Sequence, residues 1–238
     1  ARPRCMPNPW VGAVLVSSDG QTFDGFTQEF GSGHAETVCL NEAGQKAQGA
    51  TLYVTLEPCS HSGKTGPCVE RIIESRISRV VIGMKDPDRQ VCGEGIKSLQ
   101  SAGVDVVVGV LEDLVAEQLA PYVHHRNTGR PYVILKIATT LDGKVAAPDG
   151  SSQWITGAQA RREGHKLRAY SDAICVGRGT VISDNPQLTV RDWSADDDID
   201  KNLDPRRIVL GSVPAEAAIH PCYEFRGDLF ELLDELGN

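Results

Sequence analysis

Four residues in the first part of the sequence have the types and the order of a hydrolytic metal site. His34 and Glu36 lie two residues apart in "HAETVCLNEAG", and Cys59 and Cys68 follow in "LEPCSHSGKTGPC". A catalytic zinc ion takes three protein ligands and keeps a fourth position open for water. Zinc acts as a Lewis acid on that water, and a nearby carboxylate moves the protons. The pattern predicts His34, Cys59 and Cys68 as ligands and Glu36 as the general acid and base.

Each piece of this pattern also has an ordinary interpretation. A lone His-x-Glu usually belongs to a surface or a helix cap, and two cysteines nine positions apart are often buried thiols. His61 could complete a closed, structural zinc site as its fourth ligand. The order of the pieces, each at a strand–helix junction, favours the open catalytic site.

The elements that must position these residues alternate between strands and helices. The sequence predicts a hairpin from strands 10–16 and 21–27, a helix at 34–43, a strand at 50–57 and a helix at 67–77. Strand 79–84, helix 93–103, strand 104–110 and helix 112–123 continue the alternation. This order predicts an α/β domain with a largely parallel sheet over residues 1–123. The helix starts at His34 and Cys68 would both face the metal and favour thiolates there.

A second α/β pattern follows a polar linker at 124–131. It begins with "YVILKIATTLDGKVA" at 132–146 and continues through a helix at 158–170 and strands at 172–177 and 206–211. The acidic stretch 192–204 is interpreted as a solvated loop, and an amphipathic helix ends the sequence at 227–238. The sequence therefore predicts two α/β domains.

Composition narrows the function classes. The formal net charge is −8 and aromatic residues make up 5% of the 238 residues, which argues against a strand-binding nucleic-acid enzyme. No apolar run approaches the roughly 20 residues that span a bilayer. Seven scattered cysteines without secretory features favour the reducing cytoplasm, where cysteines serve as metal ligands more often than as bridges.

The order "HAE", "PC" and a second cysteine resembles the zinc-dependent cytidine deaminase superfamily, in which the glutamate is an acid/base and not a ligand. Eight residues separate Cys59 from Cys68, whereas nucleic-acid deaminases usually have two. That insertion resembles the deaminase domain of the bifunctional riboflavin-biosynthesis deaminase-reductases. The segments "PNPWVGAVLV", "GATLYVTLEPCSH", "KDPD", "LKIATTLDGKVA", "SSQWITG", "LRAYSDAICVGRGTV" and "DNPQLTVR" resemble the same family in its order.

The resemblance implies a fold and a first reaction. It implies an α/β protein in which a three-layer cytidine-deaminase-like domain precedes an incomplete dihydrofolate-reductase-like domain. Zinc-dependent hydrolysis would convert 2,5-diamino-6-(5-phosphoribosylamino)pyrimidin-4(3H)-one to 5-amino-6-(5-phosphoribosylamino)uracil. Asn8 would contact the pyrimidine, Asp86 would contact the substrate, and His61 and Lys64 would hold the ribose phosphate. Asp88 stands where the family commonly has asparagine.

The resemblance also implies an NADPH-dependent reduction of the ribose arm to ribityl by the second domain. The positions implied to contact the cofactor are Ala138, Trp154, Thr180 and Asp184. The positions implied to contact the substrate are Ser152, Arg168, Leu188 and Arg191, with Lys136 and Thr156 as further candidates. The two arginines suit a phosphate. Asn185 replaces an aspartate that is usual in the family.

Length is the main departure from the family. Its reductase domains continue past the last residue here, and a helix normally precedes "PNP", so we expect a fragment truncated at both ends. The expected parts are a deaminase domain at 1–123, a linker at 124–131 and the N-terminal part of a reductase domain at 132–238. Deaminase chemistry should be intact, and NADPH oxidation at a normal family rate is not expected.

The alternatives are a deaminase with a degenerate reductase domain and a non-catalytic zinc-stabilised scaffold. The expected partner is a small phosphorylated pyrimidine, without nucleic acid or membrane, in a protein that could form homo-oligomers.

Overall fold

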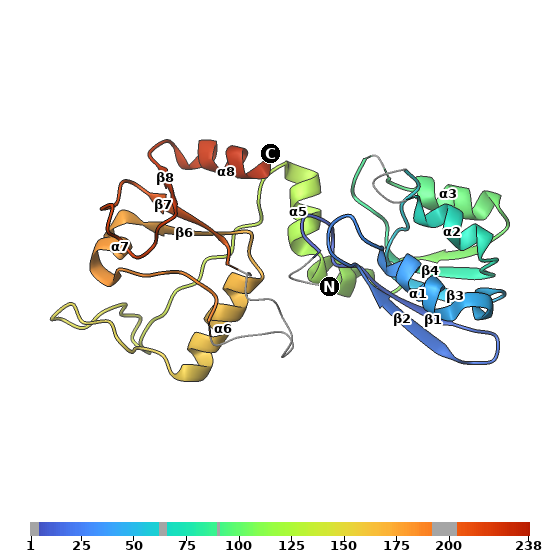
Figure 1. Ribbon diagram of the computed structural model, residues 1–238, viewed down its shortest axis with the longest axis horizontal. Coiled ribbons are helices and arrows are strands. Elements are labelled where there is room, and N and C mark those ends of the chain that lie inside the picture. Colours follow the sequence, from blue (N-terminus) through green and yellow to red (C-terminus); the bar gives the residue numbers. More distant parts are fainter. Residues whose placement is uncertain (1–4, 62–65, 90, 192–203) are drawn as a thin grey trace. The chain divides into compact units, whose positions relative to one another are not determined.

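The computed structural model describes residues 5–61, 66–89, 91–191 and 204–238. The chain divides into two compact units (Figure 1). The first unit comprises Ala1–Tyr132 with Leu236–Asn238, and the second comprises Val133–Glu235. Each unit is described by itself below.

The first unit is built on a five-stranded sheet in the order β2-β1-β3-β4-β5. The hairpin predicted from the sequence is present as β1 (Gly12–Val16) and β2 (Thr22–Phe26). The remaining strands, β3 (Thr51–Leu56), β4 (Arg79–Met84) and β5 (Asp105–Val108), are parallel to one another. Because β1 is antiparallel to both of its neighbours, the sheet is mixed and not largely parallel as predicted.

Five α-helices accompany this sheet. They are α1 (Ala35–Ala43), α2 (Cys68–Glu74), α3 (Glu94–Ser101), α4 (Glu112–Gln118) and α5 (Ala120–Thr128), and a short 3₁₀ helix, η1 (Gly44–Ala47), follows α1. Helices α4 and α5 replace the single helix predicted at 112–123, since Pro121 in the first turn of α5 cannot continue the hydrogen bonds of α4. Helix α5 enters the expected linker and ends before Gly129, which has a φ of 69°.

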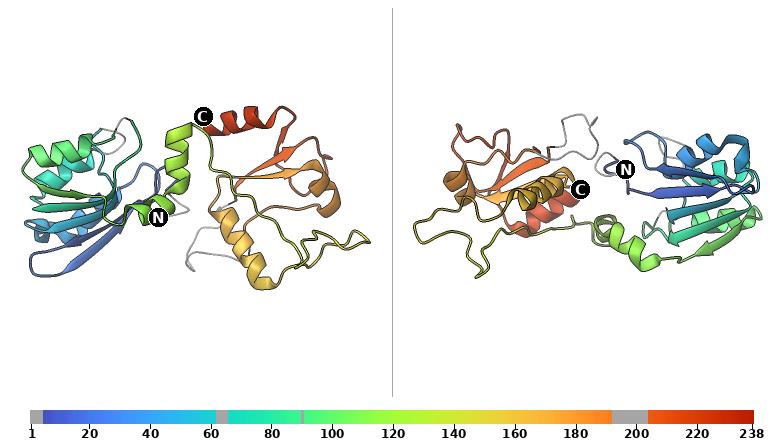
Figure 2. Two further views of the ribbon diagram at one scale, coloured as in Figure 1. Left: turned by 180° about the vertical axis from the view of Figure 1, so that it is seen from behind. Right: turned by 90° about the horizontal axis from the view of Figure 1, so that it is seen from below.

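The helices lie on both faces of the sheet. An added Cβ on Gly25 would meet Cys39 of α1, so Gly25 faces that helix. Its partners along the register share this face, and they are Ala13, Val54 and Ile82. Gly83 follows Ile82 and points the other way, towards Val115 of α4. Figure 2 shows α1 and the α4–α5 segment on opposite sides of the sheet. The first unit therefore has three layers, as predicted.

The second unit has a smaller parallel sheet in the order β6-β7-β8. Its strands are β6 (Ala173–Gly177), β7 (Arg206–Leu210) and β8 (Tyr223–Phe225). Its helices are α6 (Ala158–Ala169), α7 (Arg178–Asp184) and α8 (Leu229–Gly237). The sequence did not indicate α7 or β8, whereas β6, β7, α6 and α8 lie where it predicted them.

Residues 131–157 contain no helix or strand, although a new α/β pattern was expected to begin there. Figure 1 shows this segment as an extended yellow-green trace. Its apolar side chains are largely exposed, and Leu135 retains 81% of its accessible surface. A strand forms only where a neighbour satisfies its backbone, and the described residues provide no strand partner to this segment. The acidic stretch expected to be a loop lies outside the described residues except for Asp204.

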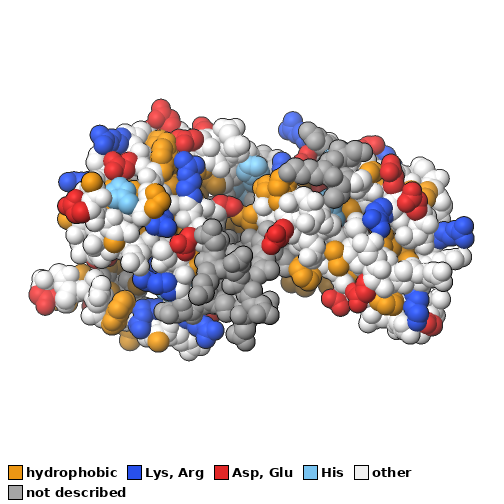
Figure 3. All heavy atoms as spheres, in the orientation of Figure 1, with side chains coloured by type: hydrophobic (Ala, Val, Ile, Leu, Met, Phe, Trp, Pro, Cys, Tyr) orange, Lys and Arg blue, Asp and Glu red, His pale blue; other side chains and the backbone are white. Residues whose placement is uncertain are grey.

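Surface composition is mixed on the face drawn in Figure 3, where apolar side chains alternate with charged ones. Within the described ranges, none of the helices combines the length and the apolar character required to cross a bilayer.

Candidate metal centre and neighbouring sites

Three of the residues that the sequence singled out converge where strands give way to helices. His34 is the N-cap of α1, Cys59 follows the end of β3 by three residues, and Cys68 is the first residue of α2. The N–H of Cys68 donates a hydrogen bond to Sγ of Cys59 at 3.4 Å, and the N–H of Val69 donates to the Cys59 carbonyl at 3.2 Å. These bonds tie the start of α2 to the segment that follows β3, so the two thiols face each other.

The spacing of the donor atoms fits a tetrahedral zinc ion. Nδ1 of His34 lies 3.5 Å from Sγ of Cys59 and 3.3 Å from Sγ of Cys68. Ordinary Zn–N and Zn–S bond lengths place a nitrogen and a sulfur ligand about 3.6 Å apart. All three ligand atoms lie within 4.8 Å of one another, and this trio is the one group of metal-binding side chains among the described residues. The site therefore offers three ligands of the types that zinc prefers.

Electrostatics in the trio favour a bound cation. The Cys68 thiol beside Cys59 lowers the pKa of the Cys59 thiol, and the same contact raises the pKa of Cys68. Contact with Cys59 raises the pKa of His34. Ionisation of Cys59 is therefore favoured, whereas ionisation of both thiols at this distance is opposed by their repulsion, which a divalent ion would relieve.

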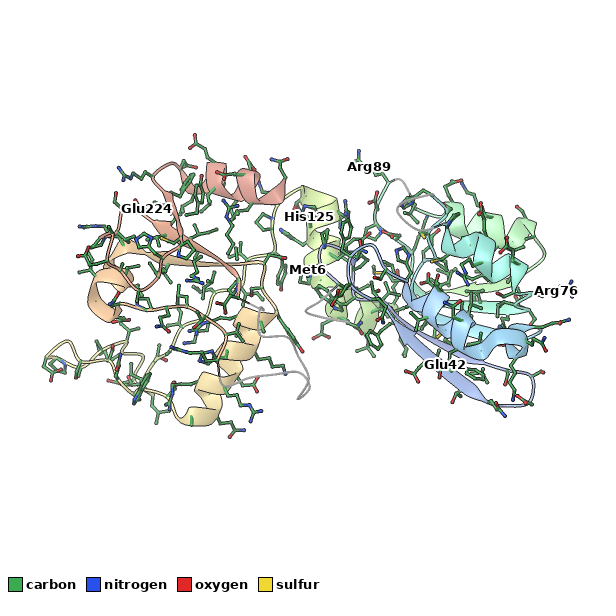
Figure 4. The ribbon with its side chains drawn as sticks, in the orientation of Figure 1. Met6, Glu42, Arg76, Arg89, His125 and Glu224 are labelled. Carbon is green, nitrogen blue, oxygen red and sulfur yellow. The ribbon has the colours of Figure 1, made fainter. Side chains whose placement is uncertain are left out.

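Glu36 lies in the first turn of α1, two residues after the candidate ligand His34. Its side chain is buried, with 4% of its surface exposed. Burial raises the pKa of Glu36 to about 7. A carboxyl group with such a pKa exchanges protons readily near neutral pH, as a general acid and base must. By contrast, Glu42 of the same helix is exposed (Figure 4).

His61 does not join the trio. It is exposed and lies outside the metal-binding group, so a closed site with four ligands has no support among the described residues. Lys64, the other residue expected to hold the phosphate, lies outside the part of the chain that the structure describes. Asn8 is half-buried in a turn, where its N–H donates to the Cys5 carbonyl at 2.9 Å.

Asp86 follows β4, the parallel neighbour of β3, and is buried. Burial raises the pKa of Asp86 above its ordinary value. Its carboxylate accepts hydrogen bonds from the N–H of Asp88 and from the hydroxyl of Tyr122. Asp88, which departs from the family asparagine, lies 3.5 Å from Nη1 of Arg126 through its Oδ2 atom. An ion pair therefore compensates the additional negative charge.

The sequence reasoning missed Glu57, a buried carboxylate two residues before Cys59. Its Oε2 atom accepts hydrogen bonds from the N–H groups of Asp86 and Gly93, and its Oε1 atom accepts one from Ile96. Gly95 in the first turn of α3 permits this approach, because an added Cβ would overlap the Pro58 carbonyl oxygen. The sequence did offer a signal for Glu57. It directly follows the buried strand β3 and precedes Pro58 and Cys59, where a charged residue is unusual unless it has partners.

In the second unit, two arginines predicted to hold a phosphate share one buried histidine. Nδ1 of His165 accepts a hydrogen bond from the N–H of Arg191 at 3.0 Å and lies 3.4 Å from Nη1 of Arg168. Arg168 also donates to the Thr189 carbonyl at 3.1 Å. Burial lowers the pKa of Arg168. His165 was not singled out from the sequence, since a single histidine in a helix gives little signal.

The other residues implied for the second unit remain dispersed. Trp154 is 71% exposed and packs beneath the guanidinium of Arg161, whose Nη1 atom donates to the Thr156 carbonyl. Leu188 is buried in the small core, with a φ of 54°. Exposed positions are Lys136, Thr180 and Asp184, and half-buried ones are Ala138 and Ser152. Asn185 ends α7 in the left-handed conformation, which suits asparagine, and accepts a hydrogen bond from the Ala218 N–H.

Comparison with known proteins matches both halves of the sequence. Residues 1–84 match the cytidine and deoxycytidylate deaminase zinc-binding region, and residues 131–220 match the RibD C-terminal domain. The solved structure of Acinetobacter baumannii RibD is 38% identical, with a TM-score of 0.87 over 98% of this chain and 72% of its own. The chain belongs to the RibD family. A Thermotoga maritima structure described as a diaminohydroxyphosphoribosylaminopyrimidine deaminase/5-amino-6-(5-phosphoribosylamino)uracil reductase is 37% identical, with a TM-score of 0.82 and the same coverage.

Curated RibD proteins are similar over most of this chain but are longer. The riboflavin biosynthesis protein RibD of Chlamydia trachomatis is 43% identical over 216 residues, which make up 90% of this chain and 57% of that protein. The Escherichia coli RibD is 42% identical over 229 residues, or 93% and 62% of the two chains. The chain thus spans about three fifths of these relatives.

Proposed function

We propose that the first unit deaminates a pyrimidine by zinc-dependent hydrolysis within riboflavin biosynthesis. The substrate is 2,5-diamino-6-(5-phosphoribosylamino)pyrimidin-4(3H)-one, and the products are 5-amino-6-(5-phosphoribosylamino)uracil and ammonia. The observation that carries this proposal is the buried Glu36 carboxyl, which interacts electrostatically with the three zinc-type residues His34, Cys59 and Cys68. The likeness to RibD proteins supports the choice of substrate over other pyrimidines.

The residues divide the chemistry between binding and proton transfer. His34, Cys59 and Cys68 would hold the zinc ion, which supplies Lewis acidity for hydrolysis when bound. Glu36 takes a proton from the attacking water and delivers it to the departing amino group, so that oxygen replaces nitrogen on the ring carbon and ammonia leaves. The raised pKa of Glu36, about 7, allows its carboxyl group to hold that proton between the two transfers. Asp86 is proposed to contact the ring edge, and Asn8, His61 and Lys64 remain proposals for the pyrimidine and the phosphate.

Replacement of Glu36 by glutamine tests this proposal directly. Ammonia release should fall by ~10²–10⁴-fold, because glutamine cannot carry the proton. The zinc content should stay at one ion per chain, since Glu36 is not a ligand. Glu42→Gln, on the exposed side of the same helix, is the matched control and should retain full activity.

Two results would contradict the proposal. Equal ammonia release from the Glu36→Gln variant and the unchanged protein would remove Glu36 from the chemistry. Zinc binding without any ammonia release by the unchanged protein would instead favour a non-catalytic, zinc-stabilised scaffold.

For the second unit we infer a part in the NADPH-dependent reduction of the ribose arm. The match to the RibD C-terminal domain supports this proposal, as do the contacts of the Arg168 side chain and the Arg191 backbone N–H with His165. The arginines would bind the substrate phosphate. Ala138, Trp154, Thr180 and Asp184 are proposed to contact NADPH, with Lys136, Ser152, Thr156 and Leu188 near the substrate. A spectrophotometric assay of NADPH oxidation with the deaminated product would test this proposal.

We also propose a cytoplasmic location and a homo-oligomeric state. The seven widely scattered cysteines support the first, and the RibD likeness alone supports the second. Light scattering coupled to size-exclusion chromatography would measure the number of chains in the assembly.

A further inference from the structure

The carboxylate of Asp86 is held from two directions by hydrogen bonds. The hydroxyl of Tyr122 lies 2.9 Å from its Oδ1 atom and 3.2 Å from its Oδ2 atom. The N–H of Asp88 donates to Oδ1 at 2.8 Å. A tyrosine hydroxyl has one proton, so it donates to one carboxylate oxygen at a time. Oδ2 therefore keeps more acceptor capacity than Oδ1.

The backbone of Asp86 is fixed to the segment that carries a zinc-type ligand. Its N–H donates to Oε2 of Glu57 at 3.2 Å, and Glu57 lies two residues before Cys59. Leu56 and Met84 are register partners at the ends of the parallel strands β3 and β4. Cys59 and Asp86 consequently leave the same edge of the sheet, where parallel α/β sheets bind their ligands.

Tyr122 is itself held in place by its own helix. Arg126, one turn later in α5, lies over the Tyr122 ring with its guanidinium carbon 5.4 Å from the ring centroid. The same guanidinium reaches Asp88 at 3.5 Å. Helix α5 thus contacts both aspartates of the "KDPD" segment with two side chains, one neutral donor and one cation.

We propose that Tyr122 is a positioning residue of the deaminase site, which orients the Asp86 carboxylate so that Oδ2 accepts an N–H from the ring edge of the pyrimidine. This inference rests on the proposed function. Burial raises the pKa of Tyr122, so the phenol keeps its proton and remains a donor throughout the working pH range. Burial also raises the pKa of Asp86, and the Tyr122 hydroxyl opposes that shift by stabilising the ionised acceptor.

The test compares kcat and KM for ammonia release by the unchanged protein and by Tyr122→Phe at equal zinc content. Phenylalanine keeps the ring and removes only the hydroxyl. KM for the diaminopyrimidinone phosphate should rise about tenfold, as for a lost hydrogen bond to a charged group, while kcat stays within about threefold. Tyr53→Phe is the matched control, because Tyr53 is an exposed tyrosine of β3, and its KM should be unchanged.

Arg126→Gln provides a second variant that keeps the Tyr122 hydroxyl. It removes the cation that lies over the ring, so KM should rise by a smaller factor, about threefold. A KM for Tyr122→Phe within twofold of the unchanged value overturns the inference and leaves the deaminase proposal intact. A fall in kcat with unchanged KM overturns it as well, since a loss of positioning for binding acts on KM. Zinc-loaded protein that releases no ammonia at all overturns the proposed function and this inference together.

Discussion

The two units differ in how far they bury and bring together their candidate functional residues. In the first, a histidine, a glutamate and two cysteines from separate segments meet in a partly buried cluster beside a three-layer core. In the second, the positions implied to contact NADPH remain at least partly exposed. Among the described residues of this unit, the buried core cluster has four members, Val181, Leu188, Val209 and Ile219. Both halves match family models, over residues 1–84 and 131–220. The difference shows that motifs acquire chemistry only where a framework buries and orients them.

Loss of one candidate metal ligand should have the largest effect on zinc binding and ammonia release by the first unit. Cys59→Ser removes a thiolate, so the bound zinc should fall well below one ion per chain and ammonia release should drop by at least about 100-fold. Elemental analysis of the purified protein alongside the ammonia assay would measure both. Cys92→Ser alters an exposed cysteine outside the trio and should leave both quantities unchanged. Full zinc content in Cys59→Ser would show that the metal binds elsewhere.

The contrast in burial predicts that truncating an apolar side chain to alanine lowers the free energy of unfolding more in the first unit than in the second. Ile82 is fully buried in β4, so Ile82→Ala should lower the free energy of unfolding by about 2–5 kcal/mol. Leu135 is exposed in the segment without secondary structure, so Leu135→Ala should change it by about 0.5 kcal/mol or less. Urea unfolding followed by circular dichroism would compare the two variants. A large loss of stability in Leu135→Ala would mean that this segment packs in solution.

Substitutions of glycine by alanine should change the free energy of unfolding by smaller amounts, and with opposite signs in the two units. Gly95→Ala places a methyl group against the Pro58 carbonyl, so it should lower the free energy of unfolding by about 1–3 kcal/mol. Gly164 lies in α6 with open space around the added Cβ, so Gly164→Ala should raise it by up to about 1 kcal/mol. Thermal unfolding curves would give the sign of each change. A stabilising Gly95→Ala would contradict the tight contact between α3 and the residues before Cys59.

Local sequence patterns predicted much of the first unit. Alternating apolar residues predicted the β1–β2 hairpin, which is present, and residue types with order singled out His34, Cys59 and Cys68, whose donor atoms lie within 4.8 Å of one another. Their role as ligands and that of Glu36 in proton transfer stay predictions. The mixed sheet was not predicted, because strand direction depends on distant pairing. The separation of α4 from α5 was also missed, although Pro121 is a local signal for it. The contacts of Glu57 and Tyr122 with the Asp86 segment join residues 29 and 36 positions apart, and no periodicity reports such contacts.

The second unit shows where local patterns fail. "YVILKIA" has the composition of a buried strand, yet it is exposed in the described structure since strand formation requires a partner. Helix α6 was predicted correctly because its hydrogen bonds are internal. The shared contact of Arg168 and Arg191 with His165 depends on a loop that returns to α6, which the sequence did not indicate.

The exposed apolar segment from Tyr132 to Ile137 also bears on colloidal behaviour. At low ionic strength, the net charge of −8 makes the molecules repel one another and keeps such segments apart. At about 0.1 M salt the Debye length shrinks to about 10 Å, so the repulsion no longer reaches across the gap between approaching molecules. This extended segment has no strand partner among the described residues and exposes leucine and isoleucine side chains, so molecules should then associate through it. Raising the salt concentration should therefore shorten the time for which a solution of this protein stays clear.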